Sequence, residues 1–380
     1  MDIEFTEEQK MLQEMVKRLA REKIAPMLPE LNKEDTFSPE LLDLLKKNGL
    51  LSILVPEEFG GPGGGVVSAC IVGEELSVVY PSALAIMGGH YLATEFIAVG
   101  GSKEMREKYL TRIGAGNTLV TTSLTEPEAG SDAAAIKTRA IKDGDCYLIN
   151  GVKQFTSNAG IADLHCVFAI TDPEKGYGGI SAFIVEKDTD GLSIGKEEDM
   201  MGMRGLHSAQ LIYEDVRVSK DNMIGPEGKG FYIAMEGFDH SRPIIGAQAV
   251  GLAQGAFDHA VRYAKERVTF GKPIAQHQSI QFMLADMATQ IEAARALVYK
   301  TAVMCDTKAK GVSKFASMSK YFASDVAMKV TTDAVQIFGG YGYMKDYPVE
   351  SLMRDAKLTQ IYDGTNQIHR MVVASNILKD

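Results

Sequence analysis

Two segments of the chain carry residue types suited to holding a ligand that combines phosphate with an aromatic ring. Residues 123–132 read SLTEPEAGSD and offer the hydroxyls of Thr125 and Ser131 beside Gly130, where a ligand can approach the backbone closely. Residues 267–278 read RVTFGKPIAQHQ and combine an arginine, which can clamp a phosphate, with an aromatic side chain. Taken alone, each segment is also typical of an ordinary turn or a helix–loop–helix connection.

A third segment, residues 336–370, is rich in glycine and ends in a helical pattern. Its glycines allow a ligand close to the backbone, and the run Tyr362-Asp363-Gly364-Thr365 precedes the last helical stretch. Read alone, Asp363-Gly364 is a turn and Thr365 is a helix cap. These three segments are the candidates for chemistry, and the rest of the chain must position them.

Composition narrows the class of protein. The chain has 380 residues, with 40 Lys and Arg against 50 Asp and Glu, so its net charge is −10. An acidic chain without a long basic run lacks the electrostatic footprint of a nucleic-acid binder. The four cysteines are scattered, which predicts no disulfide framework, no metal site and a cytoplasmic location. The amino-terminal sequence has neither signal-peptide nor transit-peptide character, and we expect no apolar run of membrane-spanning length and no membrane partner.

Hydrophobic patterning divides the chain into three domains, at 1–118, 119–226 and 227–380. The first is helical in pattern; its glycine run at 59–65 is a turn, because Val66 stands where a dinucleotide loop needs its third glycine. The second holds short β-forming runs, and Asn150-Gly151 predicts a hairpin. The third holds long apolar stripes typical of an antiparallel helix bundle.

Together the three segments resemble the acyl-CoA dehydrogenase family. The signatures T-E-P-x-A-G-S-D and Q-x-x-G-G-x-G-aromatic are present in the right order, FDHSRP at 238–243 also matches, and the resemblance covers essentially the whole chain. It is closest to the medium- and short-chain enzymes. It implies an α+β multidomain fold with an N-terminal helical domain, a central β-barrel and a C-terminal four-helix bundle. It also implies FAD, an acyl-CoA substrate, electron-transferring flavoprotein as the electron acceptor, and a homotetramer built as a dimer of dimers.

The resemblance assigns cofactor contacts position by position. Phe155 stands where the family usually has Trp against the flavin ring, and Ser157 stands where Thr is usual. Within one subunit the implied contacts are Leu124, Thr125, Gly130, Ser131, Phe155, Ser157, Thr365 and Gln367. Reaching toward the FAD of a neighbouring subunit are Arg267, Phe270, Gln278, Gln336 and Gly340.

The resemblance also implies residues that hold the acyl-CoA. Asp239 and Arg242 would hold the thioester arm, and the remaining substrate contacts are Ser131, Tyr91, Phe238, Tyr362 and Gly364. Tyr91 would approach the reactive end of the acyl chain, with Ala83, Leu84 and Met87 lining the far end. A tyrosine at that place indicates a short or compact acyl group. Two neighbours have ordinary interpretations: His90 is a satisfied helix histidine and Glu95 a solvated helix residue.

The chain departs from the family pattern at the catalytic base. The family usually has Glu in Y-E-G-T, where this chain has Asp363, and Ser241 stands where some members carry the Glu instead. Asp363 is therefore the candidate that takes the α-proton while the β-hydride passes to flavin N5. Hydrogen bonds to the thioester carbonyl would stabilise the developing oxyanion, and burial would help Asp363 act near neutral pH.

Because Asp is one methylene shorter than Glu, several interpretations stay open. Asp363 can be adapted to a bulky α-carbon, as in a branched or alicyclic substrate such as cyclohexanecarboxyl-CoA, which is the interpretation we favour. It can be a tolerated handicap in a straight short- or medium-chain dehydrogenase of β-oxidation. The chemistry can be shifted to another carbon with Asp363 secondary. Finally, the chain can be a catalytically silent flavin- or acyl-CoA-binding subunit.

Overall fold

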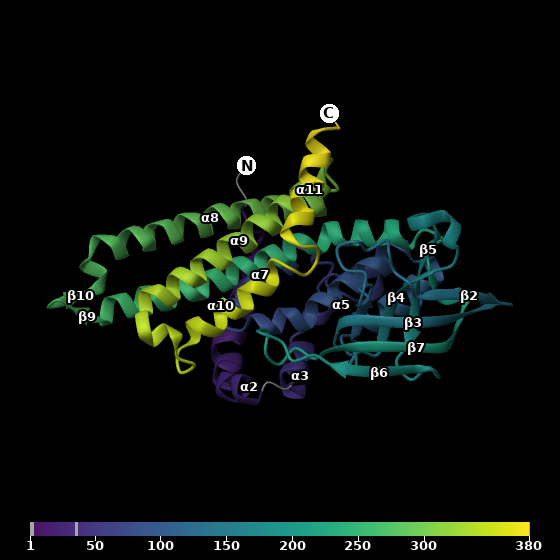
Figure 1. The fold of residues 1–380 in the computed structure, drawn as a ribbon, viewed down its shortest axis with the longest axis horizontal. Coiled ribbons are helices and arrows are strands. Elements are labelled where there is room, and N and C mark those ends of the chain that lie inside the picture. The colour runs from purple at the N-terminus through teal and green to yellow at the C-terminus, as the bar shows by residue number, and fades with distance from the viewer. Residues whose placement is uncertain (1–3, 35–36, 380) are drawn as a thin grey trace.

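The chain folds as helices, then a sheet, then helices again, as predicted (Figure 1). The computed structural model describes residues 4–34 and 37–379. The sheet domain lies at one end of the molecule and the distal ends of the long helices lie at the other, so the helical domains and the sheet meet near the middle.

The described residues of the amino-terminal part, 4–34 and 37–118, form six α-helices. They are α1 (Glu7–Leu19), α2 (Leu28–Glu34), α3 (Pro39–Lys47), α4 (Gly65–Ser77), α5 (Pro81–Gly100) and α6 (Lys103–Gly114). The glycine run before α4 forms turns, as predicted, and Gly65 has a φ of +67°. The Asp306 carboxylate accepts hydrogen bonds from the backbone N–H groups of Val66 and Val67, at 2.7 and 3.0 Å. A carboxylate of the chain itself thus caps this helix N-terminus, so these two N–H groups are not available to a phosphate.

Helix α5 corrects one expectation. By length and composition it is apolar enough to cross a membrane, contrary to our reading of the sequence. However, 72% of its most apolar window is buried inside the protein, and α5 packs against α4, α7 and the strand β1. Its apolar character is therefore that of a core helix, which is hydrophobic all round because protein surrounds it.

The central domain is a mixed sheet with the strand order β6-β7-β3-β2-β4-β5-β8, and β1 pairs with β4 in parallel. The strands are β1 (Val120–Ser123), β2 (Arg139–Asp143), β3 (Cys146–Ser157), β4 (Leu164–Ile170), β5 (Ile180–Glu186), β6 (Leu192–Glu197), β7 (Ser208–Ser219) and β8 (Met223–Ile224). β1 and β3 end beside the two cavities described below, so the sheet delivers residues 120–125 and 153–157 to the site.

The hairpin predicted at Asn150-Gly151 is wrong. Strand β3 runs through both residues with only a shift of register against β7, and the turn lies earlier, at Gly144 with a φ of +63°. A Cβ at Gly151 would lie 2.3 Å from the Thr138 hydroxyl, so glycine is required here for close approach of the neighbouring backbone. The Asn-Gly pair thus marks a bulge inside a strand rather than a chain reversal.

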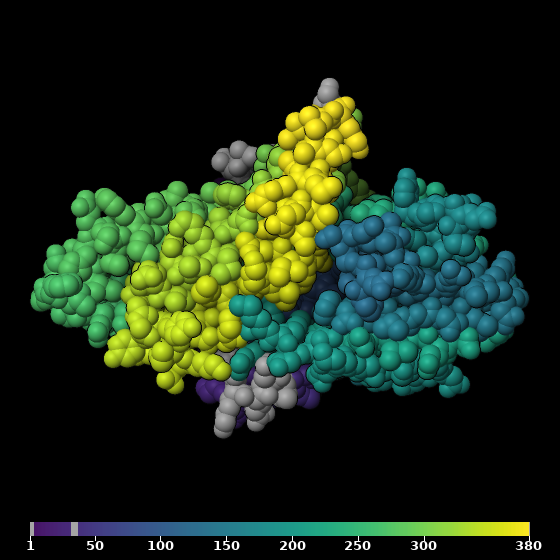
Figure 2. Space-filling view, viewed as in Figure 1, coloured from purple at the N-terminus to yellow at the C-terminus, as the bar shows by residue number. Residues whose placement is uncertain are grey.

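The carboxyl-terminal domain is a helix bundle. It consists of α7 (Gly230–Glu266), α8 (Gln278–Asp306), α9 (Val312–Phe338), α10 (Pro348–Thr359) and α11 (Asn366–Ile377), with the short hairpin β9 (Val268–Thr269) and β10 (Lys272–Pro273) at its distal end. The α8 stripe predicted from sequence packs inward at Met287, Ile291, Ala294 and Val298. In the space-filling view, the yellow carboxyl-terminal segment faces the blue and teal sheet domain across a hollow (Figure 2).

Candidate active site

Two cavities meet at the junction of the sheet with the bundle. The first has a volume of about 350 Å³ and is lined by α5, the ends of β1 and β3, α7 and residues 362–364. The second has a volume of about 550 Å³ and extends toward α10 and residues 200–208. They share the following lining residues: Thr125, Gly130, Ser131, Phe155, Ser157, Tyr362, Asp363 and Gly364. Eight residues predicted to touch cofactor or substrate therefore lie at the junction of the two cavities.

Asp363 lies where the cavities meet, in a conformation that its neighbours must enforce. Its φ is +55°, a left-handed backbone conformation that is uncommon for residues with a side chain. The Ser241 hydroxyl, on α7, donates a hydrogen bond of 2.6 Å to Asp363 Oδ2. Burial raises the pKa of Asp363, while the Ser241 hydrogen bond and the positive charges of Lys320 and Arg242 oppose that rise. The carboxyl group is thus held as a stronger base than an ordinary aspartate.

Helix α7 supplies the wall of the first cavity that faces Asp363. Phe238 and Arg242 lie one turn apart on it and both line the cavity. Arg242 is 6% exposed and donates a hydrogen bond of 2.5 Å to Asp239, while its guanidinium lies 5.8 Å from the centre of the Phe238 ring. Arg242 is therefore a buried cation fixed by Asp239, whose own carboxylate does not line either cavity.

A buried ion pair supports the end of the site formed by residues 124–126. Lys153 is fully buried in β3 and donates hydrogen bonds to Glu126 Oε1 at 2.7 Å and to the Leu124 carbonyl at 3.2 Å. The other contacts of the Glu126 carboxylate are backbone N–H groups of residues 137 and 138. These hydrogen bonds from Lys153 fix Leu124 and Glu126, the two residues on either side of Thr125. Sequence reasoning missed both residues, although an internal lysine in a β-strand is itself an unusual feature.

FAD, the cofactor implied by the resemblance, fits the second cavity. The hydroxyls of Thr125 and Ser131 line it and make no hydrogen bond within the described part of the chain, so both are open to a ligand. Phe155 is 63% exposed with a φ of +55°, which presents an aromatic ring at the cavity. Thr365, the N-cap of α11, also lines it. These residues would hold the flavin, which supplies the acceptor for a hydride when bound.

Six of the predicted cofactor residues do not line either cavity in a single chain. Gln367 is exposed on the first turn of α11. The other five lie at the distal end of the bundle, where the Arg267 guanidinium lies 5.4 Å from the centre of the Tyr341 ring and Phe270 is 96% exposed (Figure 1). These five are Arg267, Phe270, Gln278, Gln336 and Gly340. Their predicted contact with a neighbouring subunit's FAD stays a prediction.

The prediction that Tyr91 approaches the acyl chain needs correction. Tyr91 is 1% exposed, its hydroxyl donates to the Leu50 carbonyl at 2.6 Å, and it does not line either cavity. Three other residues predicted to line the acyl site also do not line either cavity: Ala83, Leu84 and Met87. The cavity is lined instead by Ala85, Gly88, Gly89 and Leu92, which recur at helical spacing on another face of α5. Because α5 is apolar all round, its sequence does not show which face meets the cavity.

The predictions for His90 and Glu95, which lie near Tyr91 on α5, have opposite outcomes. His90 is a satisfied core histidine, as predicted: its Nε2 lies 2.7 Å from the Leu51 carbonyl and its Nδ1 accepts from the Val120 N–H at 3.1 Å. Glu95 is not solvated, because it is 9% exposed and its carboxylate lies 2.7 Å from His240 Nδ1. The hydrogen bond with Glu95 raises the pKa of His240.

Comparison with known proteins agrees with this geometry. The chain matches the N-terminal, middle and C-terminal domains of acyl-CoA dehydrogenases over residues 6–117, 121–216 and 228–378. It is 49% identical to cyclohex-1-ene-1-carbonyl-CoA dehydrogenase of Syntrophus aciditrophicus over 99% of this chain and 91% of that one. It is 46% identical to acryloyl-CoA reductase (NADH) of Anaerotignum propionicum over 100% of this chain and 96% of that one.

Solved structures place the fold in the same family. Butyryl-CoA dehydrogenase of Megasphaera elsdenii superposes with a TM-score of 0.97 at 43% identity, covering 100% of both chains. A chain from the structure described as the electron transferring flavoprotein of Acidaminococcus fermentans has a TM-score of 0.97 at 46% identity, again over 100% of both chains. Three matched domains, close relatives and a shared fold lead to one conclusion: this chain belongs to the acyl-CoA dehydrogenase family of FAD-dependent oxidoreductases.

Proposed function

We propose that the chain dehydrogenates a compact branched or alicyclic acyl-CoA, such as cyclohexanecarboxyl-CoA, with Asp363 as the base that takes the α-proton. The observation that carries the proposal is the Ser241–Asp363 hydrogen bond at the junction of the two cavities. It directs a shortened base toward α7 and helps keep it ionised. The small Ser241 side chain also leaves room beside the reacting carbon.

The shape of the first cavity supports a compact acyl group. Two adjacent glycines, Gly88 and Gly89, take the places where side chains of α5 would project into it. A Cβ at Gly88 would meet only Ile245 Cδ1, at 3.9 Å, so this wall is open by one methyl group or more. Apolar contacts from Leu92, Met235 and Ile245 suit a hydrocarbon ring.

The chain's own residues account for proton removal. Asp363 has its carboxylate at the cavity, and its pKa is raised by burial, so it accepts a proton more readily than an exposed aspartate. Arg242, buried and positive, also lines the first cavity and would attract the polar thioester arm. FAD, when bound, supplies the acceptor for the β-hydride.

We also propose electron-transferring flavoprotein as the partner that receives the electrons. The support is the likeness to a chain in the structure described as the electron transferring flavoprotein of Acidaminococcus fermentans. Measuring reoxidation of the substrate-reduced enzyme by purified electron-transferring flavoprotein, with NAD⁺ as the competing acceptor, tests this. Faster reoxidation by NAD⁺ would contradict it.

The role of Asp363 is tested by two substitutions in the FAD-loaded enzyme. Asp363→Ala should lower turnover of cyclohexanecarboxyl-CoA by about 10²- to 10⁴-fold, the usual contribution of a general base. Asp363→Glu should lower it by about tenfold or more, because the longer side chain displaces the base from the bulky α-carbon. If Asp363→Glu raises turnover of this substrate, the aspartate is a handicap and the chain is a straight-chain enzyme. Unchanged turnover in Asp363→Ala would remove Asp363 from the reaction.

A further inference from the structure

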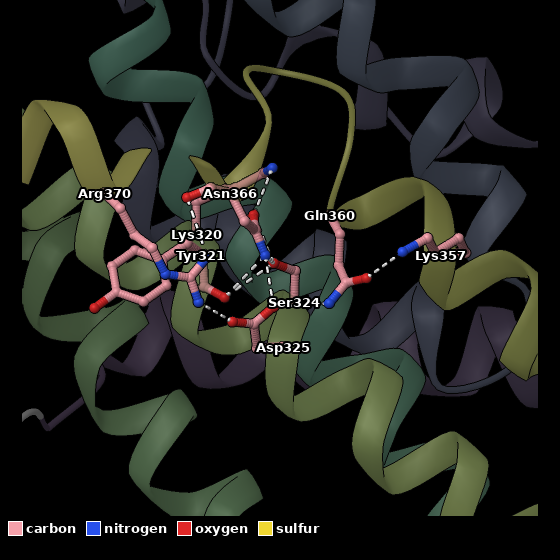
Figure 3. Close-up of polar contacts among 8 residues, drawn as sticks. All are labelled: Lys320, Tyr321, Ser324, Asp325, Lys357, Gln360, Asn366 and Arg370. Carbon is pink, nitrogen blue, oxygen red and sulfur yellow. Dashed lines mark hydrogen bonds and ion pairs between the residues drawn. The ribbon is translucent and has the colours of Figure 1, made fainter. Parts of the chain in front are cut away.

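The loop that carries Asp363 is pinned at both ends to one carboxylate of α9. Gln360 Nε2 and Asn366 Nδ2 donate hydrogen bonds to Asp325 Oδ1 at 2.7 and 2.8 Å. Arg370 Nη2 pairs with the other oxygen, Asp325 Oδ2, at 2.6 Å. Figure 3 shows the loop leaving Gln360 and returning at Asn366 above α9. The ends of the loop are therefore fixed, and the position of its middle depends on a separate contact.

That contact comes from Lys320, one turn earlier on α9. Its Nζ donates to the Gly364 carbonyl at 2.7 Å and to Asn366 Oδ1 at 3.2 Å. Asn366 is itself held by Ser324, whose Oγ accepts from Asn366 Nδ2 at 2.8 Å (Figure 3). Lys320 thus bonds the carbonyl of Gly364, the residue that follows Asp363 with its left-handed backbone.

Lys320 lies in a position that is energetically unfavourable for a charged side chain. It is fully buried, and no ion pair joins it to a carboxylate among residues 4–34 and 37–379. A buried ammonium without a paired carboxylate costs free energy that an apolar side chain of the same length would not. Packing alone would therefore favour methionine, and the lysine must be explained by the loop that it holds.

We propose that Lys320 is a positioning residue for the base, fixing the Gly364 carbonyl so that Asp363 presents its carboxylate to the cavity and stays ionised there. This inference rests on the proposed role of Asp363. It separates two contributions of one side chain, a hydrogen bond that sets geometry and a positive charge that favours the carboxylate. Lys320→Gln removes the positive charge and keeps an N–H donor, whereas Lys320→Met removes both the charge and the donor.

The charged groups around Lys320 define the pH dependence. The titratable and charged groups that influence it are Asp363 in the loop, Arg242 on α7, Asp325 on α9 and His369 on α11. Burial lowers the pKa of Lys320 to about 7, with Asp363 opposing. Below that pH the ammonium is charged and lowers the pKa of Asp363. Loss of the charge should therefore move the acid limb of base activity to higher pH.

The test uses a reaction that needs the base but no hydride transfer. Phenylacetyl-CoA has α-hydrogens and no β-hydrogen that can leave as hydride, so its α-hydrogen exchange in D₂O reports proton removal alone. Exchange is followed by NMR against pH, at saturating thioester, for the FAD-loaded enzyme and four variants. These are Lys320→Met, Lys320→Gln, Asp363→Asn and the control Lys329→Met, which removes a surface lysine of the same helix that pairs with Asp333.

Lys320→Met should lower the exchange rate by about 10- to 100-fold, because displacement of the base by about 1 Å costs that much. The acid limb of the pH profile of Lys320→Met, where the exchange rate falls because Asp363 becomes protonated, should move to higher pH. Lys320→Gln keeps an N–H donor for the Gly364 carbonyl, so it should show the same move of the limb with a smaller loss at high pH. Lys329→Met should match the wild type. Thermal unfolding of Lys320→Met should occur at or above the wild-type temperature, which a purely structural lysine would not allow.

Two results would overturn the inference, and they are distinguishable from failure of the proposed function. If both Lys320 variants keep wild-type rates and pH profiles while Asp363→Asn loses exchange, Lys320 does not position the base, although Asp363 is still the base. An equal loss at every pH with an unmoved acid limb would make Lys320 structural. Full exchange in Asp363→Asn would show that Asp363 is not the base, and the inference would fall together with the proposed function. If Lys320→Met does not fold, Lys320→Gln carries the test.

Discussion

Asp363 and Ser241 form a pair whose two members are 122 positions apart in the chain and 2.6 Å apart in the fold. The hydrogen bond from Ser241 favours the ionised carboxylate and so opposes the rise that burial causes in the pKa of Asp363. Ser241→Ala should therefore raise that pKa further and move the acid limb of kcat/KM to higher pH. Because a hydrogen bond to a charged group contributes about 1.5–3 kcal/mol, activity at acidic pH should fall by about tenfold or more.

Activity above the acid limb should change little in Ser241→Ala, because Asp363 is then ionised in both proteins. The measurement is a kcat/KM profile from acidic to alkaline pH, with Ser241→Thr as the control that keeps the hydroxyl. An acid limb that stays in place in Ser241→Ala would show that Ser241 only fills space.

The sequence identified Asp363 because a local motif surrounds it, and the structure brings it to the cavities. The partners that set its behaviour could not be predicted in the same way. Ser241 and Lys320 come from α7 and α9, and their contacts with the loop depend on how two long helices pack. The FDHSRP match marks Ser241 only as a place where some family members carry the base, and nothing in the pattern of α9 distinguishes Lys320 from the polar residues around it.

Helix α5 shows the same limit at the scale of an element. Its existence follows from the sequence, but it is apolar on every side, so periodicity cannot indicate which face meets a ligand. The family resemblance implies Tyr91 at the cavity, whereas Ala85, Gly88, Gly89 and Leu92 line it. In β3, the turn chemistry of Asn150-Gly151 was outweighed by pairing with β7 along the whole strand.

The glycines of α5 give a prediction about substrate shape. Gly88→Ala adds a methyl group in ordinary contact with Ile245, and alanine is about 1 kcal/mol more favourable than glycine inside a helix, so the protein should be at least as stable. The methyl group narrows the first cavity. Turnover of cyclohexanecarboxyl-CoA should fall by about tenfold relative to butyryl-CoA, the scale of one methylene in an apolar pocket.

The ratio of kcat/KM values for the two thioesters measures this effect, with thermal unfolding as the check on stability. Gly178→Ala, away from both cavities and at a glycine without a left-handed backbone, where an added Cβ would lie 4.0 Å from Lys175 Cβ, is the control for a general effect of removing a glycine. An equal loss on both thioesters would show that Gly88 does not select acyl shape.

At the scale of the whole molecule, the predicted cofactor residues fall into two groups at separate places. One group lines the cavities, and the other lies at the distal end of the bundle around the β9–β10 hairpin (Figure 1). We propose that a second copy of the chain brings the distal group to its neighbour's FAD, in the dimer of dimers that the family resemblance implies. Phe270, 96% exposed at the hairpin, is the clearest candidate for a contact between copies.

Phe270→Asp should therefore weaken both assembly and flavin retention, because a charge would replace an apolar contact. Light scattering after gel filtration gives the mass, and absorbance gives the flavin content per chain. Ile141→Asp, at another exposed apolar position, in the sheet domain, is the control. A full flavin content and unchanged mass in Phe270→Asp would remove the hairpin from the cofactor site.

The central claim concerns which acyl group the enzyme oxidises, and anaerobic bleaching of the bound flavin by a panel of CoA thioesters tests it most directly. The panel comprises butyryl, octanoyl, isobutyryl, 2-methylbutyryl, glutaryl, cyclohexanecarboxyl and cyclohexenecarboxyl thioesters. Because Asp363, Ser241 and the glycines of α5 leave room at the reacting carbon, we predict fast bleaching by the branched or cyclic thioesters and slow bleaching by the straight ones. Fast bleaching by butyryl or octanoyl thioester alone would contradict the account.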